Sequence, residues 1–322
     1  LQACMDYLDE MYTYTYILGM SGAAFRLMWN SKKWDGGNVD IVFMAEDWEE
    51  PFRRAFQALG YHYKTLERGE SDRTAFRDAI IESISEQAHP VLAFGVMGPP
   101  EICIVTGYDD DGDTLIGWNF FQEDPEAFPE QTFEDNGMFR KSNWRADTPG
   151  LILIAEKRSR PPQKTLDRKA LAWALDVVRT PQVGEYYGGL RAYEAWAEWM
   201  QRDADFPDDL AVLAERKMVH YDAMAMVSER ARAADFLRSM ADRHRAVAGP
   251  LRAALACYEK EHELLEPMHE ATQGFMAEPE EARRLIDADA RAKIAELVLQ
   301  ARKLDAEAAD HIERALHVIK RS

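Results

Sequence analysis

Cysteine is scarce in this sequence of 322 residues, which holds only Cys4, Cys103 and Cys257. Three widely separated thiols are too few for a disulfide framework and lack the close spacing of a structural zinc site. We therefore expect neither a metal site nor a cofactor, and a reducing, cytoplasmic compartment. The three cysteines lie among apolar residues, where a thiol usually behaves as a small buried hydrophobic side chain.

Positive charge and long apolar runs are lacking too. Lysine and arginine total 39 against 57 aspartates and glutamates, which gives a formal net charge of -18 and a pI near 4.9. This negative field argues against nucleic acid or an anionic membrane as a partner and favours a cationic or amine-bearing ligand, either a small molecule or a peptide. No run of about 18 apolar residues predicts a membrane span, and no basic-then-apolar leader opens the chain. The chain opens in helical spacing at Leu1, so we expect that residues are missing upstream of it.

Hydrophobic residues are abundant, at 47% of the chain, so a sizeable core can form. The length suits two domains of ordinary size. Residues 157–164 (KRSRPPQK) are charged, hold two prolines and show no apolar periodicity, which predicts a linker. The predicted organisation is therefore a first domain at 1–156 and a second at 165–322.

Helix and strand signals alternate in the first domain, which predicts the α+β class. The predicted helices are residues 1–11, 48–59 and 72–87. The predicted strands are residues 39–44, 61–66 and 150–156, with 12–18 as a short connection or strand and 123–142 as a polar loop. Ser21 is a plausible N-cap of a further helix, whose small following residues would allow close packing.

Residues 89–119 carry three apolar runs of strand length, at 91–96, 102–106 and 114–118. Gly98-Pro99-Pro100 is a stiff break, whereas Asp109 to Asp113, with Gly112, has the composition of a hairpin turn. This pattern predicts an antiparallel meander. The aspartates of the turn lack the later glutamate and the loop length of a calcium site, so we expect a solvated turn.

The second domain shows no convincing strand. Apolar residues recur at intervals of three and four, which predicts a helical bundle. The predicted helices are residues 166–179, 189–201, 207–241, 243–266, 278–287 and 289–319. Glu259 with His262, and Glu266 with His269, have the E-x-x-H spacing of di-iron bundles, but both copies lie on one predicted helical stretch. We therefore interpret them as a solvated charged face.

Several segments together carry a family pattern: Tyr7-Leu8, LGMSGAAFR at 18–26, PVLAFG at 90–95 and EICIVTGYDDDGDTLIGW at 101–118. With them the first half resembles the papain-like fold of bacteriocin-leader peptidases and of the N-terminal domain of butirosin-biosynthesis acyltransferases. The second half, with GLRAYEAWAEWM at 189–200, is similar to the helical tails of such relatives. The resemblance implies a papain-like domain followed by an all-α helical-bundle domain.

The resemblance also implies a catalytic arrangement of a cysteine at a helix N-terminus, a histidine at the start of the hairpin and an orienting Asp or Asn. In this sequence the cysteine position falls upstream of Leu1, the histidine position falls on Glu101 and the orienting position falls on Asn119. A carboxylate cannot form the thiolate–imidazolium pair, and as an anion it raises the pKa of a nearby thiol. We therefore predict that peptidase activity is absent.

A surviving cleft would still bind a ligand. Glu101 should lie at the mouth of a strand, where its carboxylate could hold a cation or act as a base; the alternative is an exposed strand-end glutamate. Cys103 alternates with Glu101 along that strand and would share its face. His220 and Tyr221 lie on a predicted helix that could reach the interdomain cleft, although a lone histidine there is more often structural. The complete set of ligand-binding candidates is Glu101, Cys103, Tyr108, Asn119, Ser21, His220 and Tyr221.

Three functions remain open on these grounds. The first is a peptidase-like protein without peptidase activity that binds a small molecule or peptide in the cleft between its domains. The second is an acyl-transferring or amide-forming enzyme of the butirosin type. The third is a structural protein whose helices form an oligomer interface, for example in a homodimer.

Overall fold

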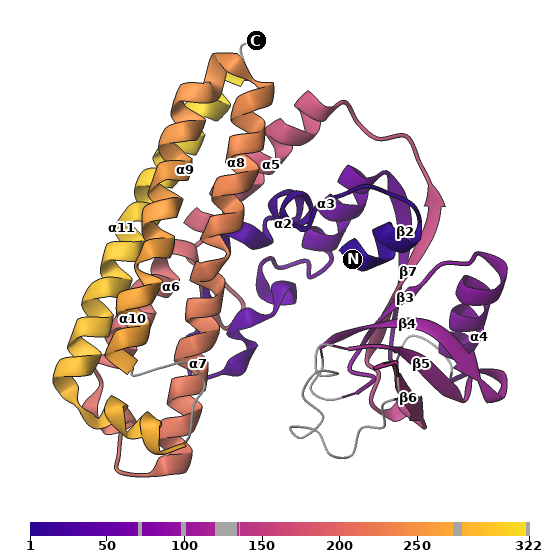
Figure 1. The fold of residues 1–322 in the computed structure, drawn as a ribbon, viewed down its shortest axis with the longest axis horizontal. Helices are drawn as coiled ribbons and strands as arrows, with labels where there is room; N and C mark the ends of the chain where they lie inside the picture. Colours follow the sequence, from indigo (N-terminus) through magenta and orange to yellow (C-terminus); the bar gives the residue numbers. More distant parts are fainter. Residues whose placement is uncertain (70–72, 98–100, 120–133, 135, 273–278, 320–322) are drawn as a thin grey trace. The chain divides into compact units, whose positions relative to one another are not determined.

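The computed structural model describes residues 1–69, 73–97, 101–119, 134, 136–272 and 279–319. It is a mixed α+β protein with one sheet-bearing region and one helical region, as predicted (Figure 1). The chain divides into two compact units, one made of Leu1–Thr13 with Phe56–Arg160 and the other of Tyr14–Ala55 with Pro161–Ser322. We call them the sheet unit and the helical unit. The division at residue 160 lies within the predicted linker, whereas the helical unit also takes in Tyr14–Ala55, a segment that was predicted to belong to the first domain.

The sheet unit is built on one six-stranded antiparallel sheet, whose strand order is β2-β7-β3-β4-β5-β6. Its strands are β2 (Tyr61–Glu67), β3 (Val91–Phe94), β4 (Ile102–Asp109), β5 (Thr114–Trp118), β6 (Phe139–Ser142) and β7 (Gly150–Lys157). Its helices are α1 (Gln2–Tyr7), α4 (Arg73–Ile81) and the C-terminal part of α3 (Glu50–Leu59). The predicted meander of β3, β4 and β5 is thus confirmed, as are the strands at β2 and β7. Strand β6 lies in the segment predicted as loop, and the Gly98-Pro99-Pro100 break lies outside the described residues.

The core of the sheet unit lies between α4 and one face of the sheet. Alternate residues along β4, such as Cys103 and Val105, point to this face and are buried together with Phe76 and Ile80 of α4. The hairpin between β4 and β5 closes through Asp110 and its neighbours, where two aspartates and Gly112 adopt positive φ angles. The predicted tight turn is therefore confirmed.

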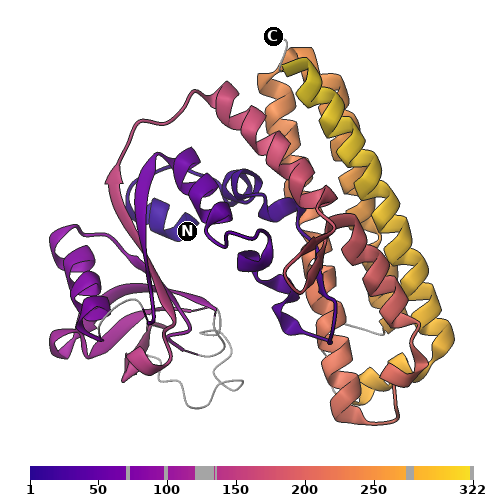
Figure 2. The same ribbon diagram turned by 180° about the vertical axis from the view of Figure 1, so that it is seen from behind.

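The helical unit contains long helices that pack side by side, as Figure 2 shows for α9 and α11 from behind. Its elements are α2 (Tyr14–Ser21), β1 (Met28–Asn30), α5 (Gln163–Arg179), β8 (Gln182–Val183), β9 (Tyr186–Gly188), α6 (Gly189–Met200), α7 (Leu210–Ser228), α8 (Arg230–Arg243), α9 (Ala248–Glu263), α10 (Leu265–Thr272), a 3-10 segment (Pro279–Ile286) and α11 (Ala288–Ile319). The predicted bundle is confirmed, but the absence of strands was wrong, because β1 and β8 both pair with β9. The two E-x-x-H pairs lie on separate helices, α9 and α10, rather than on one.

Several local predictions for residues 12–44 were wrong. Residues 14–18 belong to helix α2, and 39–44 form 3-10 turns instead of a strand. Ser21 ends α2 and does not begin a helix. Its neighbour Gly22 has a φ of +86°, and a Cβ there would lie 2.3 Å from the indole nitrogen of Trp173, so the predicted close packing is present.

Long-range aromatic packing explains why Tyr14–Ala55 joins the helical unit. Trp29 stacks on Trp196 of α6 with ring centroids 6.2 Å apart, and Trp34 meets Trp199 edge-on at 5.7 Å. All four indoles are almost completely buried. Because each buried aromatic ring removes a large apolar area from water, this contact stabilises the packing of the segment against α6 strongly.

Within the described residues, no helix combines the length and the apolar character that crossing a membrane requires.

Candidate functional site

The two residues at the family's histidine and asparagine positions lie at one end of the β4–β5 pair. Glu101 directly precedes β4 and is exposed, whereas Asn119 directly follows β5 and is buried. Trp118 pairs with Ile104 in the antiparallel register, which places Glu101 and Asn119 at the same end of these two strands. Tyr108 lies at the opposite end of β4, where it pairs with Leu115.

The three cysteines are all buried and unpaired. Burial is the first cause that raises the pKa of each thiol, and for Cys103 the negative charge of Glu101 raises the pKa further. Cys103 is fully enclosed by the apolar core of the sheet unit, with its face of β4 covered by α4. A reactive thiol needs an open, electropositive setting, which none of these three buried thiols has in this structure.

The remaining predicted site residues belong to the helical unit. The Ser21 hydroxyl donates to the Leu18 carbonyl oxygen at 3.1 Å and accepts from the Ala23 amide at 3.3 Å, so it satisfies the backbone at the end of α2. His220 is fully buried, and its Nδ1 accepts a hydrogen bond from the Trp196 indole at 3.1 Å. Burial lowers the pKa of His220 to about 3, which keeps the ring neutral. Tyr221 is hydrogen-bonded to Thr272 at 2.9 Å.

A polar cluster in the helical unit is formed by Arg230, Tyr193, Glu261 and Asp305. The side chains of all four residues are fully buried. The Arg230 guanidinium bonds to Asp305 at 2.8 Å and to the Tyr193 hydroxyl at 3.0 Å, and it donates to the carbonyl oxygens of Ala24 and Arg26. Tyr193 in turn donates to Glu261. Burial and the nearby Asp305 charge raise the pKa of Glu261 well above its ordinary value. The cluster joins α6, α8, α9 and α11 to the chain around residue 25.

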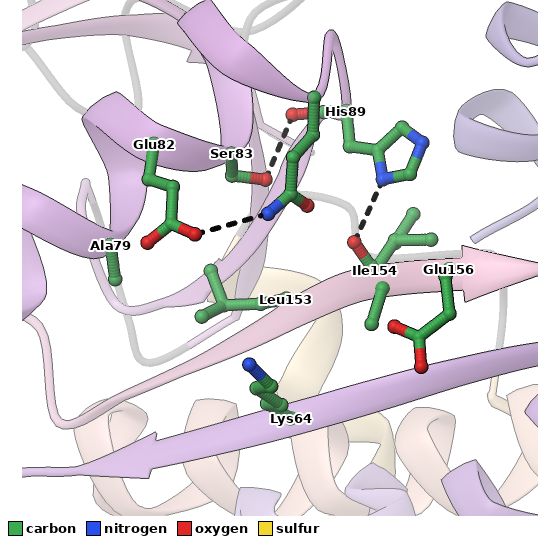
Figure 3. A pocket seen from close by; sticks show the side chains of 10 residues that line it. Lys64, Ala79, Glu82, Ser83, His89, Leu153, Ile154 and Glu156 are labelled. Carbon is green, nitrogen blue, oxygen red and sulfur yellow. Dashed lines mark hydrogen bonds between the residues drawn. The ribbon is translucent and has the colours of Figure 1, made fainter.

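A concave site with unpaired charges lies wholly in the sheet unit. It is a pocket of about 220 Å³ on the side of β7 (Figure 3). Its lining comes from β2, β7, the end of α4 and the turn that follows: Lys64, Ala79, Glu82, Ser83, Gln87, His89, Leu153, Ile154, Ala155 and Glu156. Apolar side chains thus form its floor, and ionisable groups stand around it.

The turn that supplies this pocket is irregular. Helix α4 continues into a π-helical turn at Glu82–Glu86, and Ala88 then adopts a φ of +54°, which is uncommon for a residue with a Cβ. Two hydrogen bonds close the turn, because the His89 amide donates to the Ser83 carbonyl at 2.8 Å and the Ser83 hydroxyl donates to the His89 carbonyl at 3.1 Å. π-Helical turns and strained backbone concentrate at functional sites, so the irregular turn marks this pocket as a candidate site.

The imidazole of His89 is held in one tautomer. Its Nδ1 lies 2.9 Å from the carbonyl oxygen of Ile154 (Figure 3), and a carbonyl only accepts hydrogen bonds. Nδ1 therefore carries the hydrogen, and Nε2 of the neutral ring is an acceptor. Such orientation by a backbone carbonyl is typical of histidines that bind ligands or protons through the other nitrogen.

The charged groups of the pocket are not paired with one another. Glu82 accepts only a long hydrogen bond of 3.4 Å from Gln87, and no ion pair joins Lys64, Glu82 or Glu156 to any residue in the described part of the chain. The structure leaves two carboxylates and one ammonium available to a bound molecule.

Tyr108, one of the predicted ligand-binding residues, contacts the turn that supplies this pocket. Its hydroxyl lies 2.6 Å from the Ser85 hydroxyl, on the π-helical turn that carries Glu82. Tyr108 thus supports the turn and does not line the pocket. The ionisable groups that do line it, Lys64, Glu82, His89 and Glu156, were not singled out from the sequence.

A larger pocket of about 500 Å³ lies near the β4–β5 turn, but its polar groups already satisfy one another. Asp113 pairs with Arg145 at 2.7 Å, and the Thr114 hydroxyl bonds to Asp110 and Ser142. Across the described residues, no group of three or more His, Cys, Asp or Glu side chains is placed to hold a metal ion.

Comparison with known proteins gives no family for this chain. No protein-family model matches the sequence, and no curated protein matches it either.

Proposed function

We propose that this chain is a papain-like-fold protein that binds a small amine-bearing molecule and does not cleave peptides. The fold proposal is supported by the antiparallel β4–β5 pair, in which Gly107-Tyr108-Asp109 ends β4 directly before the aspartate turn. It is also supported by the position of Glu101 and Asn119 at the same end of β4 and β5, since the resemblance assigns the histidine and the orienting residue to these two positions.

The state of the thiols supports the absence of peptidase chemistry. Cys4, Cys103 and Cys257 are buried, and burial raises their pKa values, which disfavours the thiolate. A carboxylate at residue 101 adds negative charge where a peptidase requires an imidazolium. Both effects oppose nucleophilic catalysis by these cysteines.

The observation that carries the binding proposal is the pocket in Figure 3, where the unpaired carboxylates of Glu82 and Glu156 stand around an apolar floor. A primary ammonium donates three hydrogen bonds and carries one positive charge, so it complements the carboxylates that line the pocket. A cavity of about 220 Å³ corresponds to roughly seven water volumes, which limits the ligand to a small molecule.

The test is isothermal titration calorimetry with small primary amines such as butylamine and putrescine. We expect measurable binding to the natural chain and at least a tenfold loss in the double variant Glu82→Gln/Glu156→Gln, because each charge-assisted hydrogen bond contributes about 1.5–3 kcal/mol. The matched control is Asp6→Asn/Asp111→Asn, which also removes two exposed carboxylates from the sheet unit but leaves the pocket intact.

Two results would overturn the proposal. One is equal binding to both double variants, which would mean that amines bind through general charge. The other is rapid, stoichiometric labelling of a cysteine by 5,5′-dithiobis(2-nitrobenzoate) at pH 7, which would restore a thiol enzyme of the acyl-transferring type.

A further inference from the structure

Building on the proposed function, we infer that the ligand is a zwitterion, whose amine is bound by Glu82 and whose carboxylate is bound by Lys64. The pocket holds charges of both signs, and the two signs come from different elements. Lys64 extends from strand β2, whereas Glu82 is supplied by the π-helical turn after α4.

Lys64 is placed by the register of the sheet. It pairs directly with Leu153 of β7, so both side chains leave the same face of the sheet, and both line the pocket. Lys64 is exposed and forms no ion pair with any residue that the structure describes. Its ammonium is therefore free to bind an anionic group.

Glu82 and Lys64 flank the apolar floor without touching. In Figure 3 the Leu153 side chain lies between the Glu82 carboxylate and the Lys64 ammonium. No ion pair joins the two groups, so their charged atoms are more than 4.0 Å apart. A ligand with an ammonium at one end, a carboxylate at the other and a short aliphatic chain over Leu153 would satisfy both groups at once.

Simple amines would satisfy only half of this arrangement. An amine at Glu82 leaves the Lys64 ammonium near a second positive charge, whereas a zwitterion pairs both protein charges and adds no net charge. Amino acids and ω-amino acids are the chemical class that meets this description within the available volume.

The experiment compares each zwitterion with the amine obtained by removing its carboxylate. Calorimetric dissociation constants are measured for β-alanine against ethylamine, 4-aminobutanoate against propylamine and lysine against cadaverine. We expect at least one zwitterion to bind tenfold more tightly than its partner amine. We expect Lys64→Gln to bring that ratio close to one while changing the affinity for the amine less than about threefold.

The control is Lys164→Gln, which removes an exposed lysine from the helical unit and should keep the tenfold ratio. The inference is overturned if no zwitterion binds more tightly than its amine, or if the ratio survives in Lys64→Gln. Either result leaves the proposed function standing when amines still require Glu82 and Glu156. If neither the amines nor the zwitterions bind to the natural chain, in contrast, the proposed function itself is refuted.

Discussion

The two units of this protein use charged side chains in opposite ways. In the helical unit, Arg230, Glu261 and Asp305 have no exposed surface. Arg230 donates a hydrogen bond to Asp305 and forms an ion pair with Glu261 inside the bundle. In the sheet unit, Lys64 and Glu82 are exposed around a pocket and are joined to no ion-pair partner among the described residues.

This difference separates structural from binding roles. A buried charge is tolerated only when it is paired, and removing one partner leaves the other at high cost. An exposed charge contributes little to stability, so its removal should leave the free energy of unfolding almost unchanged and should lower only the affinity for a ligand. Strongly shifted pKa values therefore mark the architecture of the helical unit, and concave shape with unpaired groups marks the candidate site.

The largest effect is expected at Arg230. Arg230→Met removes the cation that neutralises Asp305 and breaks the hydrogen bonds to the carbonyls of Ala24 and Arg26. We expect the free energy of unfolding to fall by about 3–5 kcal/mol. The measurement is urea unfolding followed by circular dichroism at 222 nm. The matched control is Arg238→Met on the same helix, whose exposed ion pairs contribute at most about 1 kcal/mol. Similar losses in both variants would contradict a special role for the buried cluster.

A pH-dependent effect is expected at His220. Its pKa is about 3 in the folded protein and near 6.5 when unfolded, so only the unfolded chain gains the proton as the pH falls below 6.5. The contribution of the neutral His220 to the free energy of unfolding is therefore fully present above pH 6.5. It is lost as the pH falls toward 3, by up to about 1.4 kcal/mol per pH unit. His220→Asn should flatten this acid limb, because asparagine can accept the Trp196 hydrogen bond without titrating. Parallel pH profiles for the two proteins would contradict this account.

Glu261 should act in the opposite direction. Its folded pKa lies above its ordinary value of 4.5, so its contribution is fully present below pH 4.5 and is lost as the pH rises toward the folded pKa. Relative to the natural chain, Glu261→Gln should gain stability with rising pH, by up to about 1.4 kcal/mol per unit. Urea unfolding at pH 5, 6 and 7 measures this difference. A constant difference across that range would show that Glu261 is not the titrating group.

The smallest change in stability is expected at the pocket. Glu82→Gln/Glu156→Gln removes exposed charges that have no ion-pair partner in the described chain, so the free energy of unfolding should change by less than about 0.5 kcal/mol. Differential scanning calorimetry measures the change. A loss of several kcal/mol would place these carboxylates among the structural groups and remove the contrast between the two units.

Local chemistry was sufficient to predict much of the sheet unit. The three apolar runs before and after the aspartate turn gave β3, β4 and β5, and the apolar setting of the cysteines predicted their burial. These features depend on alternation and turn residues that lie close together in the sequence. Glu101 was likewise correctly expected at the mouth of its strand.

The rest depends on contacts between distant residues. Residues 14–55 belong to the helical unit because Trp29 and Trp34 pack on α6, and no local sequence pattern predicts this packing. The pocket arises because the β2–β7 register brings Lys64 beside Leu153 and because the helix after residue 81 widens into a π turn. In the sequence, residues 72–87 have only the pattern of an ordinary amphipathic helix, so Glu82 and His89 could not be recognised as neighbours.

The most direct test of the contrast is a side-chain NMR titration of protein labelled with ¹⁵N in histidine and arginine. On addition of 4-aminobutanoate, we predict that the imidazole signals of His89 shift in a saturable way. The signals of His220 and of the Arg230 guanidinium should remain unchanged in the same spectra. Shifts at His220 or Arg230 with an unmoved His89 would contradict the account and would place ligand binding in the helical unit.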